Sequence, residues 1–355
     1  MIFIKTVSMS TDQKKIDLHH IFKYLLILIP VGVIGNLLFT FFKTDRTIWS
    51  AWHSFSHGYL MMAFTLSLIP WFTNAARLWI WMRFLKNPVP YKNAFYIVLA
   101  TEMGSAISPT AVGGGYVKLG MLIQKGFPAG SAASVMILGT LEDLSFFMIT
   151  IPLALWYSGA HRLPIFHQIF ITIQDKSGSV FWILGTLCGL ILCLMLVHHF
   201  HIRQKIKTSR FYQKLYNRIR TFFTEFITVY HTIGKKGKFL FFITFTLTAI
   251  QWICRYSVIS ALLACFHITV QPILFFLLQW IVFSLGTFIP TPGGAVGIEA
   301  AFLLVYSTFI PAPMIGLVTA AWRFLTYYVL LTLGSILFFS LNYQSLKKSP
   351  SAVHK

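Results

Sequence analysis

Long apolar segments recur through almost the whole chain, and they restrict its fold more than any other feature. A segment of about 20 apolar residues can cross a bilayer as an α-helix, which satisfies its backbone polar groups internally. Only 11% of the 355 residues are charged, against about 25% in soluble domains, so most of the surface faces lipid. We therefore expect an all-α polytopic membrane protein with about eight full spans. These are Ile21–Phe42, Gly58–Trp81, Lys92–Ile107, Ser131–Tyr157, Val180–Phe200, Phe239–Phe266, Pro272–Ile289 and Met314–Leu341, of which the third and seventh are short.

A short motif occurs twice, each time within a hydrophobic stretch. The pattern Pro-Thr-x-x-Gly begins at Pro109 and again at Pro290, and the distance between these two prolines defines an offset between the halves of the chain. Proline removes a backbone donor and glycine permits close backbone approach, so each motif interrupts a helix. Broken hydrophobic segments at matching positions mark the substrate site of transporters built from repeats. The sequence therefore predicts one repeat at about 57–157 and a second at about 239–341.

The same offset aligns charged residues of the two halves. Lys118 aligns with Glu299, and Glu142 aligns with Arg323. Each half thus has one basic and one acidic residue at the same spacing, with the signs exchanged. Because charges inside membrane spans are rare and usually functional, these four residues are candidates for a substrate site.

The positions of Lys and Arg predict the topology. Cytoplasmic loops are rich in these residues, and the loop at 201–238 holds ten of them against one acid, Glu225. If the short segments Gly114–Gln124 and Ala295–Phe309 also cross, ten passes place the basic loops on one side and make the halves inverted copies. Re-entrant loops at these two segments are the alternative. We expect a single integral domain over residues 1–355 in the cytoplasmic (inner) membrane, with both termini in the cytoplasm.

The net charge of +20 is concentrated in that basic loop. Within it, Phe211–Tyr230 has apolar residues at helical spacing, with basic residues over much of the remaining surface. A basic amphipathic helix of this kind lies on an anionic leaflet. Ordinary retention of positive charge on the inner side, without a specific partner, explains the pattern equally well. Neither interpretation involves a nucleic-acid partner.

Eight charged residues lie in the predicted membrane interior, four of each sign. An unpaired charge costs roughly 2.5–3.5 kcal/mol at a helix centre, so we expect these side chains to face one another or a hydrated cavity. A purely structural set of ion pairs that clamps the two repeats is the alternative. Arg77 lies near a helix end, where we expect it to snorkel, whereas Arg255 lies midway along its span. The eight are Arg77, Lys118, Arg255, Arg323, Glu102, Glu142, Asp143 and Glu299.

Glu142 and Asp143 are adjacent, and this arrangement suggests a second role. Neighbouring helix positions point about 100° apart, so both cannot face one partner equally well. Two like charges this close favour protonation of one of them. Proton coupling through Glu142, Asp143 and Glu102 is one interpretation, and a carboxylic acid buried in its neutral form is the other.

The glycines of the two motifs predict an anion site. Interrupted helices direct free N–H groups into a cavity, where they suit anions such as phosphate. Gly113 and Gly114 in one half, and Gly293 and Gly294 in the other, would supply these amides. Lys118, Arg255 and Arg323 would supply positive charge. The alternative is that the glycines only permit tight helix packing.

Other chemistry finds little support in the sequence. His53 and His57 have the i, i+4 spacing of metal ligands, yet no nearby carboxylate or cysteine completes a site. The four cysteines all fall inside predicted spans, where they suit apolar packing. No nucleophile motif, P-loop or dinucleotide fingerprint is present. We therefore expect no metal, no cofactor and no catalytic residue.

Two stretches resemble a known family. Residues 289–299, Ile-Pro-Thr-Pro-Gly-Gly-Ala-Val-Gly-Ile-Glu, followed by Arg323 within Ala-Trp-Arg-Phe-Leu-Thr, are similar to a signature of the lysylphosphatidylglycerol synthase transmembrane-region family. The first half resembles it through Ser108-Pro-Thr, Gly113-Gly114, Lys118 and Leu141-Glu142. Gly115 and Asp143 depart from the family pattern. The soluble aminoacyl-transferase domain of some relatives is absent from this sequence, so the resemblance does not imply lipid aminoacylation.

The resemblance implies a flippase-like membrane protein rather than an enzyme. We expect a transporter that moves an anionic lipid or a lipid-linked headgroup between leaflets. Its partners would be an anionic phospholipid or a polyprenyl-phosphate lipid. Lys118, Arg255 and Arg323 would hold the phosphate, while Glu142 and Glu299 would pair with them in alternate states. The alternative is a non-transporting scaffold that presents lipid to a membrane synthetase or glycosyltransferase.

Overall fold

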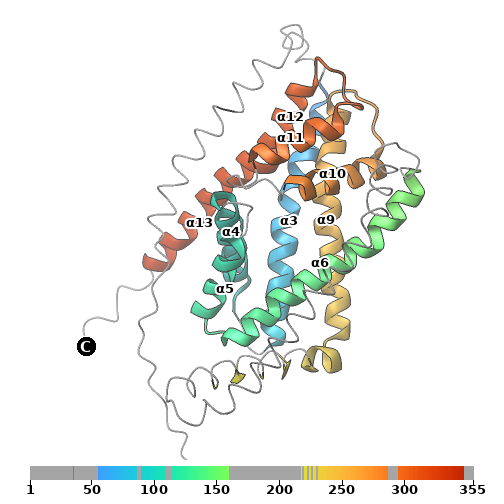
Figure 1. The fold of residues 1–355 in the computed structure, drawn as a ribbon. Coiled ribbons are helices and arrows are strands. Elements are labelled where there is room, and N and C mark those ends of the chain that lie inside the picture. The colour runs from blue at the N-terminus through green and yellow to red at the C-terminus, as the bar shows by residue number, and fades with distance from the viewer. Residues whose placement is uncertain are drawn as a thin grey trace, which may run out of the picture.

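A computed structural model of the chain describes residues 55–85, 89–108, 113–159, 231–286 and 295–347, with isolated positions at 35 and between 217 and 228. All secondary-structure elements in these ranges are helices, and none is a strand. The all-α prediction is therefore confirmed for this part of the chain. The helices form one bundle, in which α3 (His57–Phe84) and α9 (Lys238–Cys265) lie side by side at the centre (Figure 1).

The helices fall into two sets with the same order. The first set is α3, α4 (Tyr91–Ile107), α5 (Gly113–Gln124) and α6 (Ala129–Ser158). The second set is α9, α10 (Pro272–Gly286), α11 (Ala295–Tyr306), α12 (Ile315–Arg323), the π-helical turn η3 (Phe324–Tyr328) and α13 (Val329–Lys347). Helices α3 and α9 both have 28 residues and begin at positions 57 and 238, while α4 and α10 begin at positions 91 and 272. Both separations equal the one between Pro109 and Pro290, so the offset of the sequence motifs recurs as an offset between helices.

Proline and glycine set several helix ends. Pro90 and Pro128 precede α4 and α6 with extended backbone angles, ψ 146° and 144°, which separate each helix from the preceding one. Pro272 is the first residue of α10, where its missing N–H is not needed. Gly159 ends α6 with φ 65°, a left-handed conformation that favours glycine.

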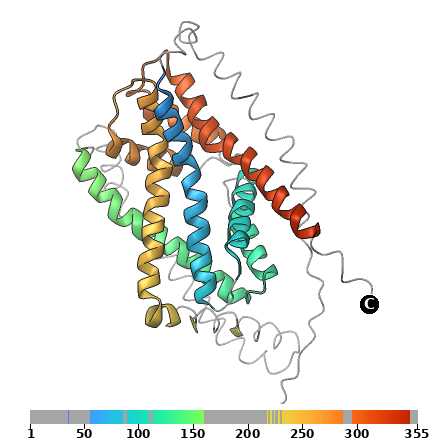
Figure 2. The same cartoon turned by 180° about the vertical axis from the view of Figure 1, so that it is seen from behind.

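The two sets pack around an antiparallel central pair. The Ser56 N–H, at the start of α3, donates to the Cys265 carbonyl at the end of α9 over 3.2 Å. Farther along, the Arg77 side chain of α3 contacts Thr248 of α9. The last helix of each set then crosses to the other set, since α6 packs on α10 and α13 packs on α4 (Figures 1 and 2). Each set therefore completes the packing of the other.

Glycine allows close contact in both short hairpins, α4–α5 and α10–α11. A Cβ on Gly104 would lie 2.7 Å from Cγ2 of Val117, and one on Gly286 would lie 3.2 Å from Cα of Ile298. Val117 and Ile298 are themselves matched by the offset that relates the two motifs. The two hairpins thus use the same device, a small residue on the first helix opposite a β-branched residue on the second.

The helices can be compared with the predicted spans. Six of the eight predicted spans correspond to α3, α4, α6, α9, α10 and the α12–α13 run, although η3 interrupts the last of these. Among the described helices, three are long and apolar enough to cross a membrane, at Ala129–Ser158, Lys238–Cys265 and Ile315–Phe338. Helices α5 and α11 have 12 residues each, about 18 Å of helix, against a hydrocarbon core of about 30 Å. The total number of passes stays a prediction.

Several predicted features lie outside the described residues. These are the spans at 21–42 and 180–200, most of the amphipathic segment at 211–230, and residues 109–112 and 287–294 of the two motifs. Within the amphipathic segment, the isolated positions 217, 220, 221, 224, 227 and 228 are helical and exposed.

Candidate functional site

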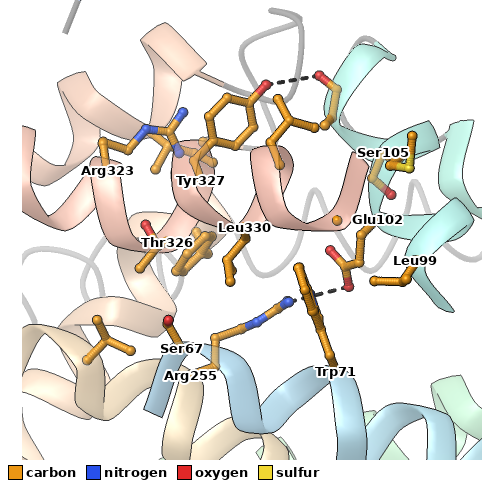
Figure 3. Close-up of a pocket in the computed structure, with 18 residues that line it drawn as sticks. Ser67, Trp71, Leu99, Glu102, Ser105, Arg255, Arg323, Thr326, Tyr327 and Leu330 are labelled. Carbon is orange, nitrogen blue, oxygen red and sulfur yellow. Dashed lines mark hydrogen bonds and ion pairs between the residues drawn. The ribbon is translucent and has the colours of Figure 1, made fainter. Parts of the chain in front are cut away.

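A pocket of about 340 Å³ lies where the two sets of helices meet. Its wall combines residues of α3 and α4 from the first set with residues of α9, α10, α11, α12, η3 and α13 from the second. Three charged side chains, Glu102, Arg255 and Arg323, line it beside mainly apolar and aromatic ones. In Figure 3, Arg323 and Tyr327 come from the helix that faces Arg255 across the pocket. The structure thus brings three of the predicted site residues into one cavity.

The Arg255–Glu102 ion pair spans the pocket between the two sets. Arg255 Nη2 lies 3.4 Å from Glu102 Oε1, and both side chains are about one-third exposed, at 29% and 36%. The Arg255 guanidinium also lies over the ring of Trp252, 5.6 Å from its centroid. Because the pair is partly exposed, a charged ligand can compete for either partner.

Arg323 is held at the opposite wall. Its Nε donates to Glu299 Oε1 over 3.2 Å, and its guanidinium lies 4.6 Å from the centroid of the Tyr327 ring. The Arg323 side chain is 3% exposed, and its Nη2 has no hydrogen-bond partner among the described residues. A buried guanidinium nitrogen without an acceptor is uncommon and needs an explanation.

The π-helical turn η3 begins directly after Arg323. Such turns are rare and occur frequently at functional sites. The turn carries Thr326 and Tyr327, which both line the pocket, and the Tyr327 hydroxyl donates to the Ala106 carbonyl of α4 over 3.1 Å. Tyr327 therefore links the Arg323 wall to the first set of helices.

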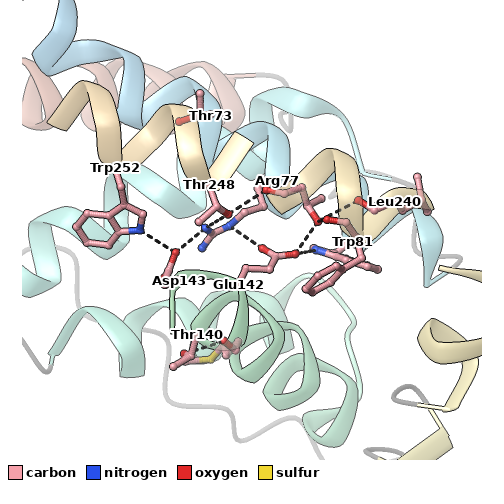
Figure 4. Close-up of polar contacts among 12 residues, drawn as sticks. Thr73, Arg77, Trp81, Thr140, Glu142, Asp143, Leu240, Thr248 and Trp252 are labelled. Atoms are coloured by element: carbon pink, nitrogen blue, oxygen red, sulfur yellow. Dashed lines mark hydrogen bonds and ion pairs between the residues drawn. The ribbon is translucent and has the colours of Figure 1, made fainter. Parts of the chain in front are cut away.

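A second charged cluster lies between α3, α6 and α9 (Figure 4). Arg77 Nη1 lies 2.8 Å from Asp143 Oδ1, and Arg77 Nε lies 3.3 Å from Glu142 Oε2. Arg77 also donates to Thr248 Oγ1 over 2.7 Å. The expectation that Arg77 snorkels to the membrane surface is wrong, because this residue is only 5% exposed. Two carboxylates on α6 hold its guanidinium inside the bundle.

Glu142 is fully buried in this cluster. Trp81 Nε1 and Thr244 Oγ1 both donate to its Oε1, over 3.0 Å and 2.6 Å. Asp143 is less enclosed, with a side chain 28% exposed, and it accepts a bond from Trp252 Nε1 over 3.0 Å. The adjacent acids therefore share Arg77 but differ in their access to the surroundings.

Lys118 takes no part in either set of ion pairs among the described residues. It lies on α5, partly buried, within electrostatic range of Glu102, Glu142 and Asp143. In the second half the matched charges, Glu299 and Arg323, form a direct pair, whereas in the first half Glu142 is bound by Arg77. The matched positions of the two halves therefore carry charges of opposite sign, but the ion pairs that these charges form differ between the halves.

The motif glycines are engaged by the protein itself. The Gly113 N–H donates to Ser108 Oγ over 2.8 Å, and a Cβ on Gly114 would lie 2.6 Å from the Thr101 carbonyl oxygen. These contacts favour the packing interpretation in the first half. Gly293 and Gly294 lie outside the described residues.

Sequence reasoning missed the aromatic residues of the two charged sites: Trp252 and Tyr327 lie against Arg255 and Arg323, while Trp81 donates to Glu142 beside Arg77. Trp81 lies one helical turn after Arg77, Tyr327 one turn after Arg323, and Trp252 one turn before Arg255. Residues three or four apart share a helix face, so this spacing is a signal that could have identified them. Among the described residues, no group of three His, Cys, Asp or Glu side chains is placed to hold a metal.

The bundle, its apolar spans and its enclosed charges define the class of protein: this is an integral membrane protein. It belongs to the family described as lysylphosphatidylglycerol synthase TM region, whose model matches residues 23–334. The resemblance inferred from the sequence is therefore confirmed. The chain is also similar to a UPF0104 membrane protein of Archaeoglobus fulgidus, with 22% identity over 341 residues that cover 90% of this chain and 96% of that protein.

Proposed function

We propose that the protein is a flippase-like transporter that moves an anionic lipid, or a lipid-linked headgroup, between the leaflets of the cytoplasmic membrane. The observation that carries the proposal is the pocket at the junction of the two helix sets, lined by Glu102, Arg255 and Arg323. Its ligand would be an anionic phospholipid or a polyprenyl-phosphate lipid. The protein would act without a cofactor and without chemical change to the lipid.

The choice of an anionic ligand rests on spare hydrogen-bond donors. A guanidinium has five N–H donors and no acceptor. Two of these donors can bind two oxygens of one phosphate at the same time. Arg323 Nη2 is buried without a partner among the described residues, and Arg255 faces Glu102 at the long distance of 3.4 Å. A phosphate between the two arginines would satisfy these donors, while the apolar part of the wall would contact the rest of the lipid.

Alternation between leaflets would come from the two sets of helices, which we take to be inverted repeats. Three observations support this: the common offset of the motifs and helix starts, the antiparallel central pair α3 and α9, and the exchange of α6 and α13 between sets. An axis in the membrane plane relates such repeats, and one repeat can rock against the other around a central site. Binding would exchange the Arg255–Glu102 pair, which joins the two sets, for contacts with the ligand.

Translocation of a labelled lipid by purified protein in liposomes tests the proposal. Vesicles containing fluorescent phosphatidylglycerol, with and without protein, would be compared by the fraction of label that an external quencher reaches over time. We expect wild-type protein to accelerate translocation, and Arg323→Gln or Arg255→Gln to slow it at least tenfold. Arg83→Gln is the matched control, since Arg83 is exposed near the end of α3 and does not line the pocket.

Equal rates for wild type and both pocket variants would refute the assigned site. No acceleration by wild-type protein, together with stoichiometric co-purification of a membrane synthetase or glycosyltransferase, would favour the scaffold function instead.

A further inference from the structure

Trp252 contacts both Arg255, which lines the pocket, and Asp143, which belongs to the Arg77 cluster. Its indole Nε1 donates to Asp143 Oδ1 over 3.0 Å, and its ring lies below the guanidinium of Arg255 at 5.6 Å. Arg255 in turn pairs with Glu102 in the pocket. A continuous series of side chains therefore runs from an acid outside the pocket to the ion pair that lines it.

We propose that Asp143 binds a proton that is coupled to ligand binding in the pocket, with Trp252 as the connecting side chain. The inference rests on the proposed function and adds an energy source to it. The proton would come from water on one side of the membrane and leave to water on the other side.

Charge balance around Asp143 gives the first argument. Arg77 contacts two carboxylates, so these three groups carry one excess negative charge when all are ionised. Two other titratable groups lie near Asp143, Lys118 on α5 and Tyr256 on α9. Glu102 on α4 lies near Lys118. Helix α10 contains no titratable residue. Lys118 makes no ion pair with any described residue. A bound proton would remove the excess charge directly.

Accessibility then selects Asp143 over Glu142. Glu142 is fully buried and accepts two hydrogen bonds on one oxygen while Arg77 lies beside the other. The Asp143 side chain is 28% exposed, and both of its hydrogen bonds go to Oδ1. Its Oδ2 has no hydrogen bond with the described residues, so a proton can bind there without breaking an existing contact.

On α3 and on α9, one amide side chain with a buried oxygen lies between a cluster residue and a pocket residue in the sequence. Asn74 Oδ1 and Gln251 Oε1 are buried there without a hydrogen-bond partner in the described part of the chain. Each lies within one helical turn of a cluster residue, Arg77 or Thr248, on the side toward the pocket residues Trp71 and Arg255. Buried oxygens of this kind are normally satisfied by a donor, so each of these two is available to accept a hydrogen bond between the two sites.

The coupling has a defined direction. A neutral Asp143 attracts the Trp252 N–H and the Arg77 guanidinium less strongly than a carboxylate does. Arg77 would then pair with Glu142 alone, and Trp252 would be free to shift beneath Arg255. Because Arg255 would separate more easily from Glu102, an anionic ligand would bind more tightly as the pH falls.

Binding measured as a function of pH tests this inference. The probe is dioctanoyl phosphatidylglycerol, titrated into detergent-purified full-length protein between about pH 5 and 8. For wild-type protein we expect Kd to rise with pH by up to about tenfold per pH unit, the limit for one linked proton. Asp143→Asn, which mimics the neutral acid, should bind tightly at every pH. Trp252→Phe keeps the Arg77–Asp143 pair but lacks the indole N–H, so its pH dependence should fall to less than threefold over the range.

The controls separate the outcomes. Trp156→Phe, at an exposed tryptophan of α6, should retain the full pH dependence. The inference would be overturned if Kd depends fully on pH in Asp143→Asn but not in Glu102→Gln. The acid that titrates would then be the one in the pocket. A dependence on Na⁺ at constant pH, rather than on pH, would overturn it as well.

The two proposals fail in different ways. If phosphatidylglycerol binds wild-type protein equally at every pH, the coupling is wrong and the pocket assignment stands. If the probe binds at no pH, the proposed function is wrong and the coupling with it. Should Asp143→Asn not fold, Trp252→Phe decides the result, because it leaves every ion pair of the cluster in place.

Discussion

Replacement of Arg77 by methionine is the sharpest test of how the bundle is held together. Arg77 is 5% exposed and is the only described cation within ion-pair distance of Glu142 and Asp143. Methionine replaces the aliphatic part of the arginine side chain but has no charge, so Arg77→Met would leave two adjacent carboxylates on α6 without their counter-ion. It would also remove the donor that binds Thr248 on α9.

The magnitude follows from the burial of the partners. Removal of one member of a buried ion pair costs about 3–5 kcal/mol, because the remaining charge stays inside without compensation. With roughly 2 °C per kcal/mol for a chain of this size, the expected loss is about 6–10 °C in Tm. Adding Glu142→Gln should recover part of it, since glutamine can still accept from Trp81 and Thr244 and no fully buried charge remains. A coupling of about 0.5–3 kcal/mol between the two changes is expected for residues in contact.

Thermal unfolding of the detergent-purified variants measures this effect. The readout is the loss, with rising temperature, of the monodisperse protein peak in size-exclusion chromatography. Arg83→Met is the matched control: it is the same substitution on the same helix, at an exposed position where the guanidinium lies over the Trp79 ring. We expect a shift of less than about 2 °C there, as for most surface changes. An equally small shift for Arg77→Met would refute the reasoning and return Arg77 to a snorkelling role.

Two further changes test the junction and the hairpins. Tyr327→Phe removes the hydrogen bond to the Ala106 carbonyl that links η3 to α4, and should cost about 1 kcal/mol in thermal unfolding; an unchanged Tm would mean that this link is not needed. Gly286→Ala places a Cβ against the backbone and side chain of Ile298 and should destabilise by about 1–3 kcal/mol, whereas in Gly334→Ala the new Cβ makes only an ordinary 3.4 Å contact and should be neutral. Equal effects of the two glycine changes would contradict the close packing of α10 and α11.

Helical class and repeat register were accessible from the sequence for definite reasons. A bilayer permits few backbone arrangements, so long apolar segments predict helices directly. The sequence separation between the two Pro-Thr-x-x-Gly motifs also separates the start of α3 from that of α9 and the start of α4 from that of α10. Each motif therefore has the same position relative to the helices of its own set. The family resemblance rested on the same stretches.

Charge pairing was less accessible. Lys118 and Glu142 have the same spacing as Glu299 and Arg323, yet only the second pair is in contact. Arg77 reaches Glu142 from another helix, α3, which is distant from α6 in the chain, and no local spacing contains that information. The bond between Trp252 and Asp143 likewise joins two helices distant in the chain, although the spacing of Trp252 from Arg255 was a local signal for their contact.

What the sequence by itself determined is the class of the molecule: a membrane bundle of helices with two matching halves and eight charges inside it. Hydrophobicity, helix breakers and repeated motifs are local properties, and they need no knowledge of the packing. Only the tertiary structure decided which charges meet, because an ion pair depends on the angle and depth at which helices cross. It assigned Glu102, Arg255 and Arg323 to a shared pocket and Arg77, Glu142 and Asp143 to a separate cluster.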